Sequence, residues 1–482
     1  MMGNFSIALS GLEADSTALN TIGNNLANLN TTAYKGQTTS FEDLFHQQIG
    51  ESGAGDPIQV GSGTKVGSTT TNFSEGTLLP DANGNSSDMA LDGNGFFLVE
   101  QNGQQSLTRA GNFTVANNGS LTTQDGQFVL GYPATAGVVN TNTNPQPITL
   151  PVGATEGAQA TQNISVTANL NSGATVGTTF TTPVKIFDSL GQSHQATITY
   201  DKTGTNTWSY SVALPAGDAA GSANATGTLS FDTSGNLIPP QTPTTPTWPT
   251  STAVTVGSTV VDSNGNLEKV TSISGTGTTG GAAPVWGVAP GATTTDNAGA
   301  NQVVWTNLGP VSTVPGPITF TGLADGASNL SFNWNLNGGG TSPLISQLAS
   351  ANSNGAQTND GFPSGNYTGF IVDPSGVIQA QFSNGNTQTI GQVAVANVAN
   401  VQGLVSVGGN NFQTTGASGQ AVAGVAGTGG RGVVDDSTLE QSNVNISTEF
   451  SNLIVAQRAF EANSKTVTTF DTISQDVIAM VR

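Results

Sequence analysis

The chain has no cysteine, which excludes disulfides, thiol catalysis and cysteine-ligated metal sites. Charged residues make up only 8% of it, and ten residues in all are Lys or Arg. Nucleic-acid binding requires a cluster of basic side chains, but these ten are scattered along the sequence and the net charge is −20. We therefore exclude nucleic acid as a partner.

The sequence also lacks long apolar runs. No stretch approaches the roughly 20 apolar residues that a membrane-spanning helix needs, so we expect no membrane association. The first residues contain no basic region, continuous apolar core or small-residue cleavage site of the kind that a secretory signal carries, and the first basic residue is Lys35. Export would therefore use a route that needs no cleavable signal peptide.

Glycine, threonine, serine and asparagine are abundant instead, with 63 Gly among 482 residues. Such a composition is typical of a turn-rich β-protein whose surface is hydroxyl and amide rather than ionic. Disorder is the alternative explanation, but short alternating strands and a hydrophobic content of 35% confine it to limited loops. The length allows about three domains of roughly 150 residues each.

Long helical patterns occur at the two ends, over residues 5–29 and 439–481. In each, apolar side chains recur every seven residues, which places them on one seam of a helix that needs a partner helix. We predict a discontinuous α-helical terminal domain, an antiparallel and coiled-coil-like helix pair, with mainly β outer domains between its halves. The predicted assembly interface consists of the apolar residues Phe5, Leu12, Leu19, Ile22, Leu26, Leu29, Ile446, Leu453, Phe460, Val467, Phe470 and Val477.

The second helix is expected to begin at Ser437, with Glu440 completing a capping box. A helix from there to Met480 would be about 60 Å long at 1.5 Å per residue, roughly twice the length of the first. A helical hairpin that merely closes one monomer would leave much of the longer apolar stripe uncovered. We therefore favour assembly into a filament over a closed monomer.

Short apolar runs separated by Asn-Gly and Asp-Gly predict β-hairpins between the helices, because these dipeptides supply the positive φ angles of tight turns. Phe96–Val99 and Phe128–Leu130 are two such runs. Ahead of them, Phe41–Phe45 is expected to form one amphipathic turn. The predicted domains are a terminal-helix core, a linker loop, a discontinuous β domain and an outer β domain, at residues 1–34 with 437–482, 35–64, 65–160 with 340–436, and 161–339, respectively.

Residues 240–310 stand apart within the outer β domain. A proline-rich stretch at 239–248 leads into them, and they contain three of the five tryptophans, Trp248, Trp286 and Trp305. We predict a small inserted β-module here. Its host domain is then split around it.

No catalytic, cofactor-binding or metal-binding set emerges from the sequence, so we expect a protein that is not an enzyme and needs no cofactor or metal. The acidic turns at 81–85 and 262–266 lack the Gly and Glu positions of a helical calcium loop, which favours plain hairpin turns. His46 and His194 are the two histidines. Neither has an acidic partner or a nucleophile beside it in sequence.

The two chain ends resemble the bacterial flagellar axial proteins, the rod and hook family. The C-terminal match runs through Leu439–Val444 and Ile454–Asn463. One departure is Ala33, where the family usually has Gly, so we expect a less tight turn there. The residues that follow the family signature are Ser10, Gly11, Asn24, Asn25, Ala27, Asn28, Asn30, Thr31, Tyr34, Lys35, Gln457 and Arg458.

Within this family the chain resembles the hook branch most. Gly131–Ala134, Val184–Gly191 and the large middle domain are hook-like, whereas rod subunits are shorter and lack that domain. The loop at 46–63 is similar to an extra stretch in distal rod proteins, which keeps a distal rod-like subunit as the runner-up. The resemblance covers about residues 1–230 and 325–482.

The resemblance implies a mechanical role, as the subunit of a curved, flexible tube that passes motor torque to the flagellar filament. It implies self-assembly, type III export and an extracellular place in the flagellum. The implied partners are further copies of the chain, the distal rod protein, the hook cap, the hook–filament junction protein and the type III export apparatus. A phage-tail-like or adhesive surface fibre is the alternative of another class, and an extracellular hydrolase is a distant third.

Overall fold

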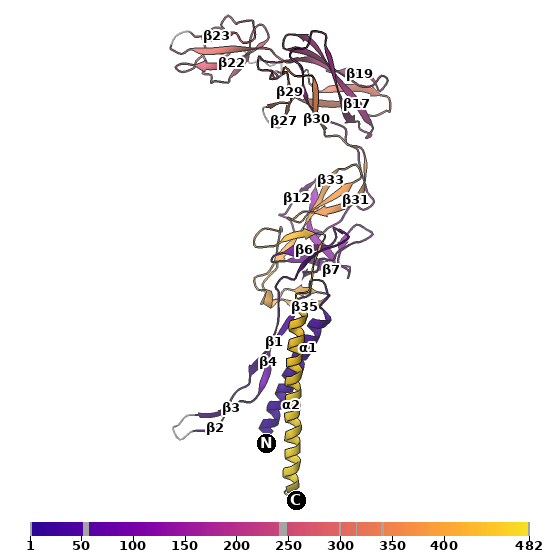
Figure 1. Ribbon diagram of the computed structural model, residues 1–482, viewed down its shortest axis with the longest axis vertical. Coiled ribbons are helices and arrows are strands. Elements are labelled where there is room, and N and C mark those ends of the chain that lie inside the picture. The colour runs from indigo at the N-terminus through magenta and orange to yellow at the C-terminus, as the bar shows by residue number, and fades with distance from the viewer. Residues whose placement is uncertain are drawn as a thin grey trace. The chain divides into compact units, whose positions relative to one another are not determined.

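The computed structural model describes residues 2–51, 57–240, 248–297, 300–314, 316–338 and 342–480. The chain forms two compact units (Figure 1). Unit 1 combines Met1–Ala154 with Tyr367–Arg482, and unit 2 is the continuous segment Thr155–Asn366. Unit 1 therefore contains both chain ends.

The terminal helices are α1 (Met2–Ala27) and α2 (Ile446–Met480). They lie side by side and run antiparallel, with the two termini at the same end of the pair (Figure 1). This confirms the predicted fold class, a terminal helix pair with mainly β structure between its halves. Helix α1 has 26 residues against 35 in α2, so it is longer relative to α2 than predicted. No helix in the described part of the chain is long and apolar enough to cross a membrane.

The predicted start of the second helix at Ser437 is wrong. Ser437 has a φ of 52°, and Glu440 ends the strand β39 (Thr438–Glu440). Helix α2 is capped instead by Asn445, whose Oδ1 accepts hydrogen bonds from the backbone N–H groups of Ser447 at 3.0 Å and Thr448 at 3.1 Å. A side-chain acceptor of this kind satisfies the free N–H groups of the first helical turn.

Unit 1 contains antiparallel strand pairs that are not part of its main sheet. The predicted linker at 35–64 is therefore largely strand, and Phe41 lies in a strand rather than in an amphipathic turn. The pairs are β1 (Gln37–Asp43) with β4 (Thr64–Thr71), β2 (Gln47–Glu51) with β3 (Pro57–Val60), β5 (Leu78–Pro80) with β39, and β6 (Met89–Asp92) with β38 (Val433–Asp436).

The main sheet of unit 1 combines strands from both halves of the unit, and the strands of the first half lie between two groups from the second half. Its strands, in order across the sheet, are β31 (Gly365–Val372), β32 (Val377–Phe382), β33 (Thr387–Val393), β11 (Phe128–Thr135), β7 (Phe96–Gln101), β8 (Gln104–Thr108), β36 (Asn411–Gln413) and β35 (Val405–Gly408). Short strands attached to its edges and ends are β9 (Thr114–Val115), β10 (Leu121–Thr122), β12 (Val138–Val139), β13 (Gln146–Pro147), β34 (Val395–Asn397) and β37 (Val422–Gly424). A 3₁₀ turn, η1 (Val401–Gly403), precedes β35. Apolar side chains from both halves share one core, which makes the unit a single folding entity.

Unit 2 consists of two sheets over a common core and a smaller third sheet. The first sheet is β16 (Thr179–Phe187), β17 (Ser193–Gly204), β18 (Thr207–Ala213) and β20 (Thr226–Ser230). The second is β19 (Ala219–Ala223), β25 (Ile318–Leu323), β26 (Leu330–Asn335), β15 (Asn163–Asn169) and β29 (Ile345–Ser346), with β30 (Ser353–Asn359) also paired to β15. The remaining strands of the unit are β14 (Thr155–Glu156), β27 (Asn337–Gly338) and β28 (Ser342–Pro343). Residues 342–366 thus lie in unit 2, rather than in the split domain to which sequence analysis assigned them.

The third sheet lies in the segment where an inserted module was predicted. Its strands in order are β21 (Thr259–Val261), β22 (Asn266–Ile273), β24 (Val303–Pro310) and β23 (Thr293–Asp296). Trp248, Trp286 and Trp305 pack together in a core separate from that of the two larger sheets. Most of the proline-rich stretch, residues 241–247, lies outside the described residues.

A recurring Asp-x-x-Gly turn joins many of the hairpins. The Asp Oδ1 accepts hydrogen bonds from the backbone N–H groups two and four residues later, and the Gly takes a positive φ that other residues adopt at a cost. The acidic turn at 262–266 is one of them, as predicted. The turns begin at Asp188, Asp232, Asp262 and Asp373.

Candidate functional site at the junction of the chain ends

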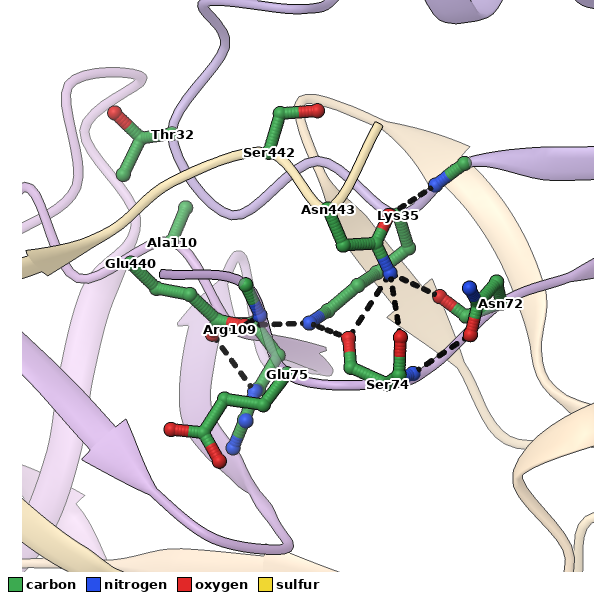
Figure 2. Close-up of polar contacts among 12 residues, drawn as sticks. Thr32, Lys35, Asn72, Ser74, Glu75, Arg109, Ala110, Glu440, Ser442 and Asn443 are labelled. Carbon is green, nitrogen blue, oxygen red and sulfur yellow. Dashed lines mark hydrogen bonds and ion pairs between the residues drawn. The ribbon is translucent and has the colours of Figure 1, made fainter. Parts of the chain in front are cut away.

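A buried ion cluster joins the N-terminal and C-terminal segments within unit 1 (Figure 2). The carboxylate of Glu440 accepts from Lys35 Nζ at 2.6 Å through Oε1, and its Oε2 lies 3.1 Å from Arg109 Nε. The side chains of Lys35, Glu440 and Arg109 are 1%, 0% and 5% exposed. Charges this deeply buried are tolerated only when they are paired and hydrogen-bonded.

Further hydrogen bonds complete the cluster. Lys35 Nζ donates to Ser74 O at 2.8 Å, and Arg109 Nη1 donates to Gly93 O at 2.8 Å and to Gly95 O at 3.0 Å. Burial lowers the pKa of the Lys35 ammonium, and the charge and hydrogen bond of Glu440 offset that effect only in part. The cluster therefore fixes the chain ends to the loop that precedes β7, at the base of the main sheet.

Asn443 forms a second link between the chain ends (Figure 2). Its Oδ1 accepts from Gly36 N at 2.8 Å, and its Nδ2 donates to Asn72 O at 2.8 Å and to Ser74 O at 2.9 Å. Its backbone N–H donates to Tyr34 O at 3.2 Å. A single amide side chain thus crosslinks three backbone segments, because it can donate and accept at once.

Asn25 does the same at the end of α1. It exchanges two hydrogen bonds with the backbone of Gln37, at 2.7 and 2.9 Å, and donates to Glu449 Oε1 in α2 at 3.3 Å. Tyr34 Oη accepts from Asn24 Nδ2 at 2.9 Å and donates to Asn25 Oδ1 at 3.3 Å. These bonds set the direction in which the chain leaves α1.

The turn at Ala33 is tight, and the expectation of a looser turn is wrong. Ala33 has a φ of 53° and is buried, and its N–H donates to Glu440 O at 2.8 Å. An alanine in the left-handed region costs roughly 1–2 kcal/mol. The contacts to the C-terminal strand hold the residue there.

The helices approach each other closely at a glycine of α1. A Cβ placed on Gly11 would lie 2.7 Å from Asn463 Nδ2, an atom that donates to Asp15 Oδ2 at 2.9 Å. Along α2, half-buried side chains recur at alternating steps of four and three residues, which is the spacing of a coiled-coil seam. They include Glu449, Leu453, Ala456, Asn463, Val467, Phe470, Ser474 and Val477.

The structure divides the predicted interface residues into two groups. Leu12, Leu19, Ile22, Leu26, Leu29, Leu453, Val467, Phe470 and Val477 are half-buried, whereas Ile446 and Phe460 are exposed. Phe5 lies in α1, but its side chain is outside the described residues. An apolar row on α2 runs from the predicted Ile446 to Phe450 and Ile454, which were not predicted; the three side chains are 47%, 50% and 58% exposed.

Most of the signature residues lie at the junction or along α1. Ser10 Oγ accepts from Thr64 N at 3.2 Å, and Asn28 Oδ1 accepts from Thr31 Oγ1 at 3.1 Å. The side chains of Ala27, Asn30, Gln457 and Arg458 are exposed. The sequence did not predict that Arg109, Glu440 and Asn443 contact Lys35 and Gly36. Glu440 and Asn443 lie in the C-terminal family match, and Glu440 was assigned to a capping box instead.

Family models match the chain in order along its length. They are "Flagella basal body rod protein" at residues 5–35, "Flagellar hook protein FlgE/F/G D1 domain" at 90–169, "Flagellar basal body protein FlaE D2 domain" at 169–362 and "Flagellar basal body rod FlgEFG protein C-terminal" at 436–480. The first and last of these cover the two segments that meet at the junction.

Curated relatives match over the full length. The flagellar hook protein FlgE of Treponema pallidum is 30% identical over 518 residues, which cover 100% of each chain. Those of Escherichia coli and Salmonella typhimurium are 30% and 31% identical over 492 residues, which cover 98% of this chain and 99% of each relative. This chain therefore belongs to the flagellar hook protein family.

Proposed function

We propose that the chain is the structural subunit of the bacterial flagellar hook, and that it polymerises through its terminal helices into a curved tube that transmits motor torque to the filament. The observation that carries this proposal is the exposed row Ile446, Phe450 and Ile454 on α2. Side chains four residues apart lie on one face of a helix. The chain itself leaves this face uncovered.

The energetics favour coverage of that row by other subunits. Burying a Phe or Ile side chain stabilises by about 1.5–3 kcal/mol relative to leaving it in water. Val455, Ile473 and Ile478 add further exposed apolar surface elsewhere on α2. A helix that packs one side against α1 and keeps other apolar sides open is suited to contact several neighbouring helices.

The predicted interface residues would then serve two purposes. Leu453 and Val467 lie on the half-buried seam and hold the two helices of one subunit together. Because they are only half covered, the same residues have surface left for a neighbouring subunit. The exposed residues, Ile446 and Phe460, would contact neighbours alone.

The family sets the remaining partners that we propose. A hook of this kind would meet the distal rod protein at its base and the hook cap or the hook–filament junction protein at its tip. Its subunits would reach the cell exterior through the type III export apparatus. We assign the chain no catalytic role, because the junction residues hold backbone segments together and none is placed to act on a substrate.

The test is polymerisation of full-length chains in which the apolar row is made polar. Phe450→Asp and Ile454→Asp should prevent tube formation in negative-stain microscopy and should abolish motility in cells that carry the variant as their only copy. Thr469→Asp is the matched control, since it adds the same charge at another exposed position of α2. It should polymerise like the unaltered chain.

Three results would count against this proposal. Normal tubes from Phe450→Asp would exclude the apolar row as an interface. Loss of helical circular dichroism in that variant's monomer would mean that the row stabilises the subunit rather than the polymer. Straight tubes from the unaltered chain would favour the distal rod-like subunit.

A further inference from the structure

One end of the sandwich in unit 2 gathers a histidine and three carboxylates. His194 Nε2 lies 3.0 Å from Asp188 Oδ2 and 3.7 Å from Asp325 Oδ2, and its Nδ1 lies 3.3 Å from Asp218 Oδ2. The sequence, in which no acidic residue stands beside His194, did not predict these contacts. The hairpin between β16 and β17 brings Asp188 back beside it, and the other two carboxylates come from loops of the second sheet.

The two carboxylates at Nε2 are positioned by the backbone. Asp188 Oδ1 accepts from Leu190 N at 2.8 Å and Gln192 N at 2.9 Å. Asp325 Oδ1 accepts from Ala327 N at 3.0 Å. Each group therefore uses one oxygen to hold its own turn and presents the other oxygen to His194. This is the arrangement of a preorganised monodentate ligand.

The loops are also tied to each other away from the carboxylates. Ser328 N donates to Ser189 Oγ at 3.0 Å, and Ala324 N donates to Asp218 O at 3.0 Å. These bonds join the loop of Asp325 to the turn of Asp188 and to the loop of Asp218. The geometry of the four side chains therefore does not depend on their attraction for one another.

The charges of the cluster do not balance. Among the described residues, no Lys or Arg forms an ion pair with Asp188, Asp218 or Asp325. A protonated imidazole would still leave an excess of two negative charges, and the side chain of Asp188 is 0% exposed. The carboxyl groups of Asp188 and Asp325 also contact each other. Facing carboxylates repel unless they share a proton or a cation lies between them.

We propose that His194 Nε2, Asp188 Oδ2 and Asp325 Oδ2 bind a divalent transition metal ion, with Zn²⁺ as the best fit. These three atoms lie within 4.8 Å of one another. Zinc–nitrogen and zinc–oxygen bonds of about 2.0–2.2 Å place the ligands of a tetrahedral site roughly 3.3 Å apart. The observed separations of 3.0 and 3.7 Å from Nε2 lie on either side of that value.

The surroundings of the three ligands also suit zinc. Asp218 receives the Nδ1 proton of His194, which leaves the Nε2 lone pair for the metal, an arrangement common around metal-bound histidines. The Asp325 side chain is 27% exposed, so water can occupy a fourth position. Calcium and magnesium prefer six or more oxygen ligands, whereas an imidazole ligand favours zinc and its neighbours.

A metal here would join the two sheets of the sandwich. Asp188 and His194 belong to the β16–β17 hairpin of the first sheet, and Asp325 follows β25 of the second. The ion would thus act as a crosslink in a protein that has no cysteine for a disulfide. This inference stands independently of the proposed function.

The test is titration of the full-length chain, first stripped with a chelator, with ZnCl₂ at physiological ionic strength. We expect one ion per chain by calorimetry, and a rise in the unfolding midpoint followed by tryptophan fluorescence. Asp325→Asn should weaken Zn²⁺ binding by at least 100-fold, because it removes a ligand. Asp218→Asn should weaken it by about 10–100-fold, the usual effect of a residue that orients a metal-bound histidine.

Two controls separate this site from general attraction to an acidic surface. Asp232 heads a turn of the same form but has no histidine beside it, so Asp232→Asn should bind Zn²⁺ like the unaltered chain. In proton NMR of the unaltered chain, Zn²⁺ should move the ring signals of His194 but not those of His46. The absence of stoichiometric binding, equal affinity of the Asp325→Asn and Asp232→Asn chains, or unmoved His194 signals would each overturn the proposal.

Discussion

Lys35 Nζ lies 2.6 Å from Glu440 Oε1, although 405 residues separate the two in sequence. Both side chains are almost completely buried. The bond joins the exit from α1 to the strand that leads into α2, so the geometry of the helix pair depends on it. Without Lys35, Ser74 O would lose a donor, and among the described residues Glu440 would keep only Arg109 as an ion-pair partner.

Lys35→Met should therefore destabilise unit 1 by about 1–3 kcal/mol, the cost of leaving buried polar groups without a partner. Urea unfolding followed by circular dichroism at 222 nm measures this, because the long α-helices of the described chain are α1 and α2. Tryptophan fluorescence is an internal control, since the five tryptophans all lie in unit 2. Lys465→Met removes an exposed lysine of α2 and should change neither signal. Equal shifts in both signals would contradict a role confined to unit 1.

Gly11→Leu should separate α1 from α2. The leucine side chain would collide with Asn463, whose amide lies 2.7 Å from the position of a Cβ on Gly11. Gly23→Leu is the matched control on the same helix, because nothing lies within 4 Å of a Cβ there. It should stabilise α1 by about 1 kcal/mol, the helix propensity gained over glycine. Only Gly11→Leu should reduce polymerisation and lower the midpoint of urea unfolding followed by circular dichroism at 222 nm.

The stability of the tryptophan-containing sheet should fall as pH rises. Glu268 is fully buried, and its burial, with a smaller contribution from Asp262, raises its pKa to about 7. In the unfolded chain the pKa of the Glu268 carboxyl returns to the ordinary value of about 4.3. The stabilisation is therefore complete below about pH 4.3 and is lost as pH rises through about 7, at a total of roughly 4 kcal/mol.

Glu268→Gln should remove this pH dependence, since glutamine does not titrate. The measurement is the unfolding midpoint from tryptophan fluorescence at pH 5 and pH 8, for the unaltered chain and the variant. We expect the difference between the two pH values to shrink in the variant and its stability at pH 8 to rise. Parallel curves for both chains would show that other groups cause the dependence.

Residues 240–310 should be dispensable for assembly. Ser312 Oγ donates to Ile238 O at 2.5 Å, so the chain leaves and re-enters its host at adjacent points, and a short Gly/Ser linker can replace the segment. The shortened chain should keep the buried Trp208 and Trp334 and still form tubes. Loss of tubes would contradict this, and loss of surface adhesion with tubes intact would favour the adhesive fibre.

The pairing of the terminal helices was predictable because a seven-residue period demands a partner helix. The start of α2 was not. Ser437 and Glu440 match the local pattern of a capping box, but Glu440 is held in a strand by Lys35 and Arg109. Lys35 and Arg109 are far from Glu440 in sequence, so the residues around Glu440 do not predict these contacts. Tertiary contacts overrode local preference here.

The outer faces of α2 and the His194 cluster were unpredictable for a related reason. A heptad pattern shows that a helix has apolar sides, but which side remains open depends on where α1 lies. The exposure of Phe450 and Ile454 follows from the position of α1, which the heptad pattern of α2 does not specify. The carboxylates around His194 come from three turns, and only the pairing of strands brings these turns together. Hairpin turns such as 262–266, in contrast, are set by residues adjacent in sequence.

The division into units also affects the order of folding. Unit 2 is one continuous segment, and the residues of unit 1 that flank it in sequence meet where Tyr367 N donates to Ala154 O at 3.1 Å. Once it has folded, the loop that must close to bring Lys35 to Glu440 is effectively halved, which lowers the entropic cost by about 0.6 kcal/mol. The junction still cannot close until the segment that contains Glu440, near the C-terminus, is available to pair with Lys35. A subunit passing through a narrow channel with its N-terminus first would therefore remain without its helix pair until passage is nearly complete, which delays polymerisation to the far side.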